Sequence, residues 1–566
     1  MAGDYSINTG VIRTFGPVDY MFFVLTLLVS AGIGIFYAIW DRRRNTPQEF
    51  LLGGKKMALF PVAMSLMVTF ISAATLLGNP AEMYNYNTMW WYLVVAFIFA
   101  IAGACRIFIP FFYNLGITST FEVDNLLIVA VFKEIVGLLY MAFLLYAPCL
   151  ALNAVTGLPL WGSVIGMGLI VTFYTSLGGM KAVLWTDTFQ AGVIFAGLLA
   201  VLIQGSIVMG GFSNAWLIAS NRSRIVFDEF DFDPKTRHTV WSMVVGGLFF
   251  WVYLYGINQA QVQRCLSCPS VKKAQMALVL NLPGLILIVS FCCMIGIEMF
   301  AFYADCHPIT FGLVENTDQL LPLFVMDILG HVDGLPGVFL SCVVSGSLSS
   351  LSSGLSALGA VTFSDSISFV HCIRLLSVAV GFYGLLAIAL AWVVSRLGSV
   401  LEAVYVVFGI LNGPVLGVIT FGMFFPWGNK WGAFFGTMTS LVLLLWIGLG
   451  AFFHDVKTPL SATSTTACNW TAKAGITKPN MFDIFVSPPA RVLEPLYQMS
   501  YMWYTGLGMI LVWGPGIVIS FLTGFTKPTS IDPRLICPIF DKLFPYLPEK
   551  ILKPLRFGIV HEGWLK

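Results

Sequence analysis

Seven serines and two glycines lie in the stretch SGSLSSLSSGLS, at residues 345–356 of a 566-residue chain. In a helix, one face about 100° wide would hold Gly346, Ser349, Ser350 and Ser353. Ser345, Ser352 and Ser356 would flank that face, and Ser347 would face elsewhere. Neutral oxygens in such a strip suit a hard monovalent cation such as Na⁺ that must also be released. Close packing of small residues between membrane helices explains the same stretch, and both interpretations stay open.

A second polar stretch, PVAMSLMVTFISAATLLGNPAEMY at residues 61–84, places hydroxyls in the middle of an apolar run. These are Ser65, Thr69, Ser72 and Thr75. A helix that unwinds in the membrane exposes carbonyl oxygens, which can bind a cation. A regular helix whose hydroxyls bond to its own carbonyls is the alternative, and this stretch alone favours the regular helix.

The stretch FYTSLGGMKAVLWTDTFQAG, at residues 173–192, predicts a helix end at Gly178 and Gly179 followed by a tight turn. Lys181 suits the inner membrane interface. Asp187 would lie near the start of the next helix, where a carboxylate favours the positive end of the dipole. The pattern fits a hinge or gate as well as a capped helical hairpin, and the hairpin is favoured.

Polar and aromatic residues also gather in WVYLYGINQAQVQRCLS, at residues 251–267. Trp251 and Tyr255 are four residues apart on one helical face and could line a substrate cavity. The amides of this stretch and its arginine would either lock an inner gate or mark the membrane interface. They are Asn258, Gln259, Gln261 and Arg264.

The composition indicates that a membrane surrounds these stretches. The chain is 58% hydrophobic and 10% charged, against about 25% charged in an ordinary globular protein. About thirteen apolar runs are long enough to cross a bilayer. We therefore expect an all-α membrane domain over residues 18–525, with an N-terminal tail at 1–17 and a C-terminal tail at 526–566.

Orientation follows from the positive-inside rule. The loop after the first run carries Arg42, Arg43, Arg44, Lys55 and Lys56, which predicts an extracellular N-terminus and, after thirteen crossings, a cytoplasmic C-terminus at the plasma membrane. The sequons at Asn221 and Asn469 then fall in outer loops and are predicted glycosylation sites.

The cysteines, the net charge and the histidines limit which other functions the chain could have. Cys306 and Cys468 lie in predicted outer loops and could form a disulfide, whereas Cys265 and Cys268 have CxxC spacing without a partner pair or histidine. A formal charge of +2 argues against nucleic-acid binding. The six histidines do not cluster and no nucleophile–base pair appears, so we expect neither an enzyme nor a cofactor.

Several motifs together resemble the sodium:solute symporter family. The two signature-like regions are YTSLGGMKAVLWTDTFQ at 174–190 and YGINQAQVQR at 255–264, and FLLGGKKM at 50–57, LLGNPAEMYNY at 76–86 and SGSLSSLSSGLSALGAVTF at 345–363 agree with them. The similarity extends almost from end to end. Within the family it is strongest to the branch of sodium-coupled monocarboxylate and sodium-dependent multivitamin transporters.

This resemblance implies a LeuT-like core of two inverted five-helix repeats, at about 59–210 and 239–425, with the first helix of each repeat broken. It implies sodium as the coupling ion, held by backbone oxygens of Val68, Ile71 and Gly346 and by the hydroxyls of Ser349 and Ser350. The substrate, a small organic anion, would lie against Thr69, Ser72, Trp91, Tyr140, Trp251 and Tyr255.

Two departures from the family pattern support a rival function. The segments at about 118–136 and 363–376 are shorter than in family members, and the first shortening would affect the helix below Tyr140. A sodium-dependent sensor or channel-like protein that does not transport substrate is therefore the alternative to a symporter that works by alternating access.

Overall fold

The structure is a computed structural model that describes residues 5–40, 52–115, 127–310, 312–314, 316–362, 369–395, 400–454, 456, 460–466, 468, 494–528, 531–557 and 559. Only the backbone is described at 38, 127–136, 174, 176–179, 359–362, 369–380 and 494. Asn469 and the arginines at positions 42–44 lie outside this part of the chain. So do residues 118–126 and 363–368 of the two shortened segments.

The described residues form helices and no strands. The α-helices are α1 (Ser6–Thr9), α2 (Pro17–Trp40), α4 (Leu59–Val68), α5 (Ala73–Asn85), α6 (Leu93–Gly103), α7 (Ile109–Leu115), α8 (Leu127–Thr156), α9 (Leu160–Val208), α10 (Phe212–Asn221), α11 (Gly247–Val252), α12 (Gln259–Leu266), α13 (Val271–Phe302), α14 (Leu320–Leu329), α15 (Leu335–Thr362), α16 (Phe369–Val394), α17 (Val400–Phe424), α18 (Lys430–Phe453), α19 (Glu494–Tyr497), α20 (Tyr504–Leu522), α21 (Ile539–Leu543) and α22 (Glu549–Leu555). Short 3₁₀ segments are η1 (Gly53–Lys55), η2 (Thr88–Tyr92), η6 (Thr317–Gln319), η7 (Tyr501–Trp503) and η9 (Pro533–Leu535), and π-helical turns are η3 (Ala104–Phe108), η4 (Ser242–Gly246) and η5 (Tyr253–Ile257).

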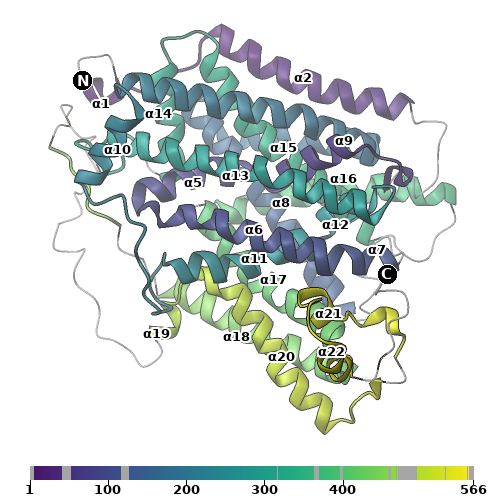
Figure 1. Ribbon diagram of the computed structural model, residues 1–566. Coiled ribbons are helices and arrows are strands. Elements are labelled where there is room, and N and C mark those ends of the chain that lie inside the picture. The colour runs from purple at the N-terminus through teal and green to yellow at the C-terminus, as the bar shows by residue number, and fades with distance from the viewer. Residues whose placement is uncertain are drawn as a thin grey trace.

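Nine helices of the described part are long and apolar enough to cross a bilayer, and two bent helix pairs bring the number to eleven. Such lengths of apolar helix are stable only when lipid or other helices surround them. The chain is therefore a multi-pass membrane protein. In Figure 1 the long helices lie side by side, with the N- and C-terminal ends of the chain at opposite ends of the bundle.

Each bent pair consists of two helical segments separated by a short break. The pair α4 and α5 is bent by 54° at residues 69–72, and the pair that joins Ser242–Ile257 to α12 is bent by 46° at Asn258. The regular helix that the stretch at 61–84 favoured on its own is therefore wrong. The unwound residues leave backbone carbonyls outside the helical hydrogen-bond ladder, as ion-binding broken helices do.

Helix α9 is continuous where the sequence predicted a turn. The backbone is helical from Leu160 to Val208, so the predicted helix end at Gly178 and Gly179 is wrong, and Asp187 does not lie at a helix start. The two apolar parts of this helix, Leu160–Phe173 and Met180–Val208, lie on either side of the glycines. Asp187 is buried inside the second part.

Helix α8 extends well below Tyr140. It begins at Leu127 and has 30 residues, so the short segment before it does not truncate the helix near Tyr140.

Helix α15 lies in the centre of the bundle and contacts α2, α8, α9 and α16. Its small residues allow close approach: a Cβ atom at Gly346 would lie 2.6 Å from the Ile71 carbonyl oxygen, and one at Gly354 would overlap Met141. The serine-rich stretch therefore serves close helix packing, whatever else it does.

One end of the bundle, here called the disulfide end, carries α1 and α10. The cystine of Cys306 and Cys468 belongs to this end, since Arg222, which follows α10, donates to the carbonyl of Ala304. The opposite end carries the C-terminal helices α21 and α22. Asn221, at the last turn of α10, is exposed at the disulfide end.

Candidate functional site

The unwound segment between α4 and α5 lies against the serine-rich face of α15. The Ile71 carbonyl faces Gly346, and Ser350 donates to the Gly346 carbonyl at 3.0 Å. The Val68 carbonyl accepts from the amide of Ile71 at 3.2 Å. The structure thus brings together Val68, Ile71, Gly346 and Ser350 from two separate elements.

Ser347 also belongs to this contact, although the helical wheel placed it elsewhere. Its hydroxyl accepts a hydrogen bond from the amide of Ala73, the first residue of α5, at 3.2 Å. The bond satisfies one of the free amides at a helix start. Ser347 therefore stabilises the helix break itself.

Ser349 points to a different partner, the carboxylate of Asp187 on α9. Its hydroxyl donates to Asp187 Oδ1 at 2.7 Å, and Ser65 of α4 donates to Oδ2. A hydroxyl that donates its proton to a carboxylate keeps its lone pairs free to accept from, or coordinate, another group. The geometry of Ser349 is therefore compatible with a cation ligand.

Arg264 of α12 completes this buried cluster. Its Nη2 lies 3.3 Å from Asp187 Oδ2 and also donates to Ser353, while its Nε donates to the Ser65 hydroxyl at 2.6 Å. Neither charged side chain is measurably exposed. Since a buried charge requires compensation, the pair links α4, α9, α12 and α15 at one point.

A cavity of about 70 Å³ lies beside this cluster. Its walls come from the α4–α5 break, α8, α12, α15 and α17, and include Thr69, Tyr140, Gln259, Ser350, Phe408 and Asn412. The carboxamide oxygen of Asn412 is buried and has no hydrogen-bond partner among the described residues. Apolar walls with a few polar groups are typical of small-molecule sites.

Comparisons with known proteins show which family the chain belongs to. The model of the sodium:solute symporter family matches residues 50–440. The chain belongs to the sodium:solute symporter family. Sodium-coupled monocarboxylate transporter 2 of Mus musculus is 39% identical over 97% of this chain and 91% of its own. The sodium-dependent multivitamin transporter of Oryctolagus cuniculus is 38% identical over 96% of this chain and 88% of its own.

A solved structure of a Na⁺-coupled sialic acid symporter, in a substrate-bound outward-open state, matches this symporter chain with a TM-score of 0.73. The two sequences are 20% identical, and the match covers 91% of this chain and 100% of that chain. The match shows a shared fold. Since the family and the named relatives are transporters, the chain is not an enzyme, and Na⁺ is the coupling ion rather than a cofactor.

The residues predicted to bind substrate lie in three places in the symporter. Thr69 and Tyr140 line the cavity together with Ser350, and Ser72 lies at the helix break beside Thr69. Trp251 and Tyr255 stack on each other with ring centroids 6.0 Å apart, but neither lines the cavity. Trp91 donates instead to Ser290 on α13, at 3.1 Å.

The signature residues hold α12, the second half of the second broken helix. Asn258 lies at the break, and its side chain accepts from the amide of Ala260 at 2.9 Å. Gln261 donates to the Leu66 carbonyl at 2.9 Å and thereby ties α12 to α4. Gln259 lines the cavity, and Lys181 packs near Gly53. The two broken helices are thus directly joined.

A buried charge cluster lies at the disulfide end of the symporter. Arg237 lies 2.8 Å from Glu82 of α5 and 3.2 Å from Glu402 of α17. Its guanidinium also lies over the rings of Tyr86 and Tyr501, at 4.2 and 4.9 Å from their centroids. Burial, and then the charge of Arg237, hold the pKa of the adjacent His238 well below its ordinary value, so His238 is neutral.

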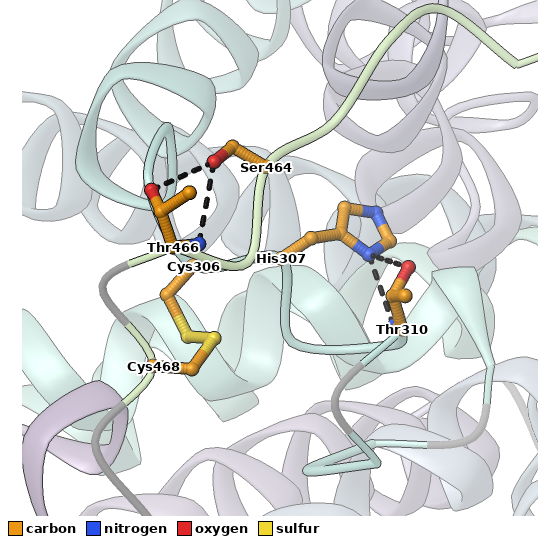
Figure 2. Close-up of a disulfide and its surroundings, with 6 residues drawn as sticks. All are labelled: Cys306, His307, Thr310, Ser464, Thr466 and Cys468. Atoms are coloured by element: carbon orange, nitrogen blue, oxygen red, sulfur yellow. Dashed lines mark hydrogen bonds between the residues drawn. A yellow bond between two sulfur atoms is a disulfide. The ribbon is translucent and has the colours of Figure 1, made fainter. Parts of the chain in front are cut away.

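A loop segment between α18 and α20 covers the same end. Arg224 donates to the carbonyls of Asn85, Tyr86, Ser461 and Ala462, so it joins this segment to the end of α5. Figure 2 shows that the disulfide of Cys306 and Cys468 lies next to the bonds that Ser464 and His307 make. The amide of His307 donates to the Ser464 carbonyl at 2.9 Å. The loop is therefore attached both covalently and by hydrogen bonds.

The last features to consider are metal-binding groups and the cysteines with CxxC spacing. Among the described residues no three His, Cys, Asp or Glu side chains form a metal-binding group. Cys265 and Cys268 are buried free thiols.

Proposed function

We propose that the chain is a symporter that couples the inward movement of Na⁺ to uptake of a small organic anion, a monocarboxylate or a carboxylate vitamin. The observation that carries the proposal is the contact between the unwound α4–α5 segment and the serine face of α15, beside a cavity. The relatives named above, a monocarboxylate transporter and a multivitamin transporter, support the substrate class.

The proposed sodium site combines backbone oxygens of Val68, Ile71 and Gly346 with the hydroxyls of Ser349 and Ser350. Its support is geometric: the Ile71 carbonyl at the helix break faces Gly346 of α15, and Ser350 lies one turn further along that helix. Oxygen is the ligand that hard cations prefer. The neighbouring ion pair of Asp187 and Arg264 is neutral as a whole, so a bound sodium ion would keep its attraction for an anion nearby.

The proposed substrate site is the cavity lined by Thr69, Tyr140, Phe408 and Asn412. None of these side chains carries a formal charge that would bind a carboxylate. The sodium ion beside Ser350, together with the hydroxyl of Tyr140, would balance the substrate charge. Binding of sodium first would then increase affinity for the anion, which is a coupling free energy between two sites.

The proposed topology has thirteen spans, two LeuT-like repeats at about 59–210 and 239–425, an extracellular N-terminus and a cytoplasmic C-terminus. Two shorter apolar helices, Leu160–Phe173 and Gly381–Val394, would raise the eleven spans to thirteen. Each repeat would begin with one of the bent helix pairs. Support for the orientation comes from the disulfide and the exposed Asn221 at one end of the bundle, since both cystines and glycans belong to the outer side.

The function is tested by uptake into cells that express the chain, with Na⁺ replaced by choline. We expect sodium-dependent accumulation of at least one of lactate, butyrate, nicotinate, biotin and pantothenate. A sensor or channel-like protein would instead show sodium currents without accumulation of any of them, and that result would overturn the proposal.

The sodium site is tested by Ser350→Ala and Ser349→Ala. A hydrogen bond or ligand contact to a charged group contributes about 1.5–3 kcal/mol, so we expect the half-saturating Na⁺ concentration to rise roughly 10- to 100-fold. Ser356→Ala is the matched control, since the Ser356 hydroxyl donates to the Ser352 carbonyl of its own helix and lies outside the proposed site. Unchanged sodium dependence in both test variants would refute the assignment.

A further inference from the structure

A buried carboxyl group outside the sodium and substrate sites has half of its hydrogen-bonding capacity unused. Glu298 lies one turn before the end of α13 and has no measurable exposure. Its Oε1 accepts a hydrogen bond of 2.5 Å from the Ser206 hydroxyl on α9. Its Oε2 has no hydrogen-bond partner among the described residues.

The neighbouring helices leave space for this side chain but offer no charge. A Cβ atom at Gly205 would overlap Glu298 Oε2 and would lie 3.4 Å from the ring of Phe324 on α14, so the glycine accommodates the carboxyl group. Within the described part of the chain, the Ser206 hydroxyl is the hydrogen-bond partner of this carboxyl group. The α10 helix, which contacts both α9 and α13, contains no titratable residue.

The titratable groups in the same region already have partners elsewhere. Asp327 of α14 accepts from Ser6 and from the Tyr303 hydroxyl. His331, beyond α14, contacts Gln204. On α5, Glu82 faces Arg237. Among the described residues, no Lys or Arg side chain forms an ion pair with Glu298.

An ionised carboxylate without a counter-charge is costly inside a membrane protein, by several kcal/mol, and such groups take up a proton instead. We infer that Glu298 is a proton-binding site, separate from the sodium site, and that the proton resides on Oε2 while Oε1 accepts from Ser206. The structure thus holds Glu298 as a neutral carboxylic acid.

This proton would favour the packing of α13 against α9 and α14. Glu298 bonds to Ser206 of α9 and lies against Gly205 of the same helix, next to Phe324 of α14. The contact with α5 is on another face of α13, at Gly296, since two residues of a helix lie about 200° apart. If α13 moves away from α9 and α14, water reaches the carboxyl group and its proton is released. A ligand that binds one of two conformations more tightly shifts the equilibrium toward it, and the ligand here is the proton.

Infrared spectroscopy of the purified full chain in lipid tests the inference directly. We expect the difference spectrum of the wild type and Glu298→Gln at neutral pH to contain the C=O stretching band of a protonated carboxylic acid. Glu402→Gln is the control, since Glu402 is partly exposed and paired with Arg237, and its replacement should leave this band in place. If Glu298→Gln removes no such band, the group is ionised and the inference is wrong.

A second variant covers the case in which Glu298→Gln does not reach the membrane. Ser206→Ala removes the hydrogen bond to Oε1, and because that bond weakens the C=O bond, the band should move to higher frequency. An unmoved band would overturn the assignment to Glu298. In uptake assays between about pH 6 and 9, the half-saturating Na⁺ concentration should vary with pH in the wild type and stay constant in Glu298→Gln. Identical pH profiles would overturn the coupling to transport.

Discussion

Removal of Arg237 should open the disulfide end of the bundle. Arg237 pairs with Glu82, and both side chains are 7% exposed. Loss of one partner of a buried pair leaves the other charge uncompensated, at about 3–5 kcal/mol. The pair with Glu402, whose side chain is 42% exposed, contributes at most about 1 kcal/mol. We therefore attribute most of the effect of Arg237→Leu to Glu82.

The expected change in the ratio of open to closed molecules follows from the burial of these charges. The cluster is dry only while α5 and α17 are closed together, so the penalty of about 3 kcal/mol falls on the closed state. That amounts to a change of roughly 100-fold in the ratio of open to closed molecules. The double variant Arg237→Leu/Glu82→Leu removes both charges and should recover most of the closed population, because apolar replacements of both partners are often neutral.

The assay measures access to the cavity from the outside. A cysteine introduced at Asn412 is labelled with a membrane-impermeant maleimide on intact cells, and the chain without that cysteine provides the background. We expect labelling to be faster in Arg237→Leu by up to about 100-fold, close to the wild-type rate in the double variant, and nearly unchanged in Glu402→Gln. A wild-type rate in Arg237→Leu, with normal surface expression, would refute the reasoning. So would a double variant that remains as open as the single one.

Three further predictions concern packing, pH and the disulfide. Gly346→Ala should abolish sodium-dependent uptake, since its Cβ would lie 2.6 Å from the Ile71 carbonyl, whereas Gly192→Ala, with nothing within 4 Å, should retain uptake. Burial raises the pKa of Asp318 to about 6, so the folded chain retains a proton that the unfolded chain has lost; thermal stability should fall as pH rises from about 4 to about 6, and Asp318→Asn should remove that slope. Cys468→Ser should lower stability by about 2–5 kcal/mol, measured as a lower melting temperature, and addition of Cys306→Ser should lower it no further.

The membrane spans were predictable because apolar runs of about 20 residues have few alternatives to a bilayer. The breaks were not. Thr69 and Ser72 are as compatible with a regular helix, in which hydroxyls bond to their own carbonyls, as with an unwound segment. What separates the two is the neighbour: Ser347 on α15 binds the free amide of Ala73, and no pattern within residues 61–84 contains that partner.

The serine-rich stretch at residues 345–356 shows a similar limit of prediction from sequence. The helical wheel correctly grouped Gly346, Ser349 and Ser350 on one face, because helical period alone fixes that grouping. It placed Ser347 elsewhere and gave it no role, because a wheel assumes one important neighbour. Helix α15 is surrounded, so each of its faces meets a different helix, and a residue off the strip can stabilise the break as directly as one on it.

Asp187 and Arg264 show why local signals mislead at a buried site. The glycines before Asp187 suggested a helix end, and an acidic residue soon after one favours a new helix start. The backbone instead continues as helix, and the carboxylate is satisfied by Ser65, Ser349 and an arginine 77 residues away. A fully buried acidic residue that stays ionised needs such partners wherever they lie in the sequence. For an intramembrane charge, the better question of a sequence is therefore which distant opposite charge can reach it.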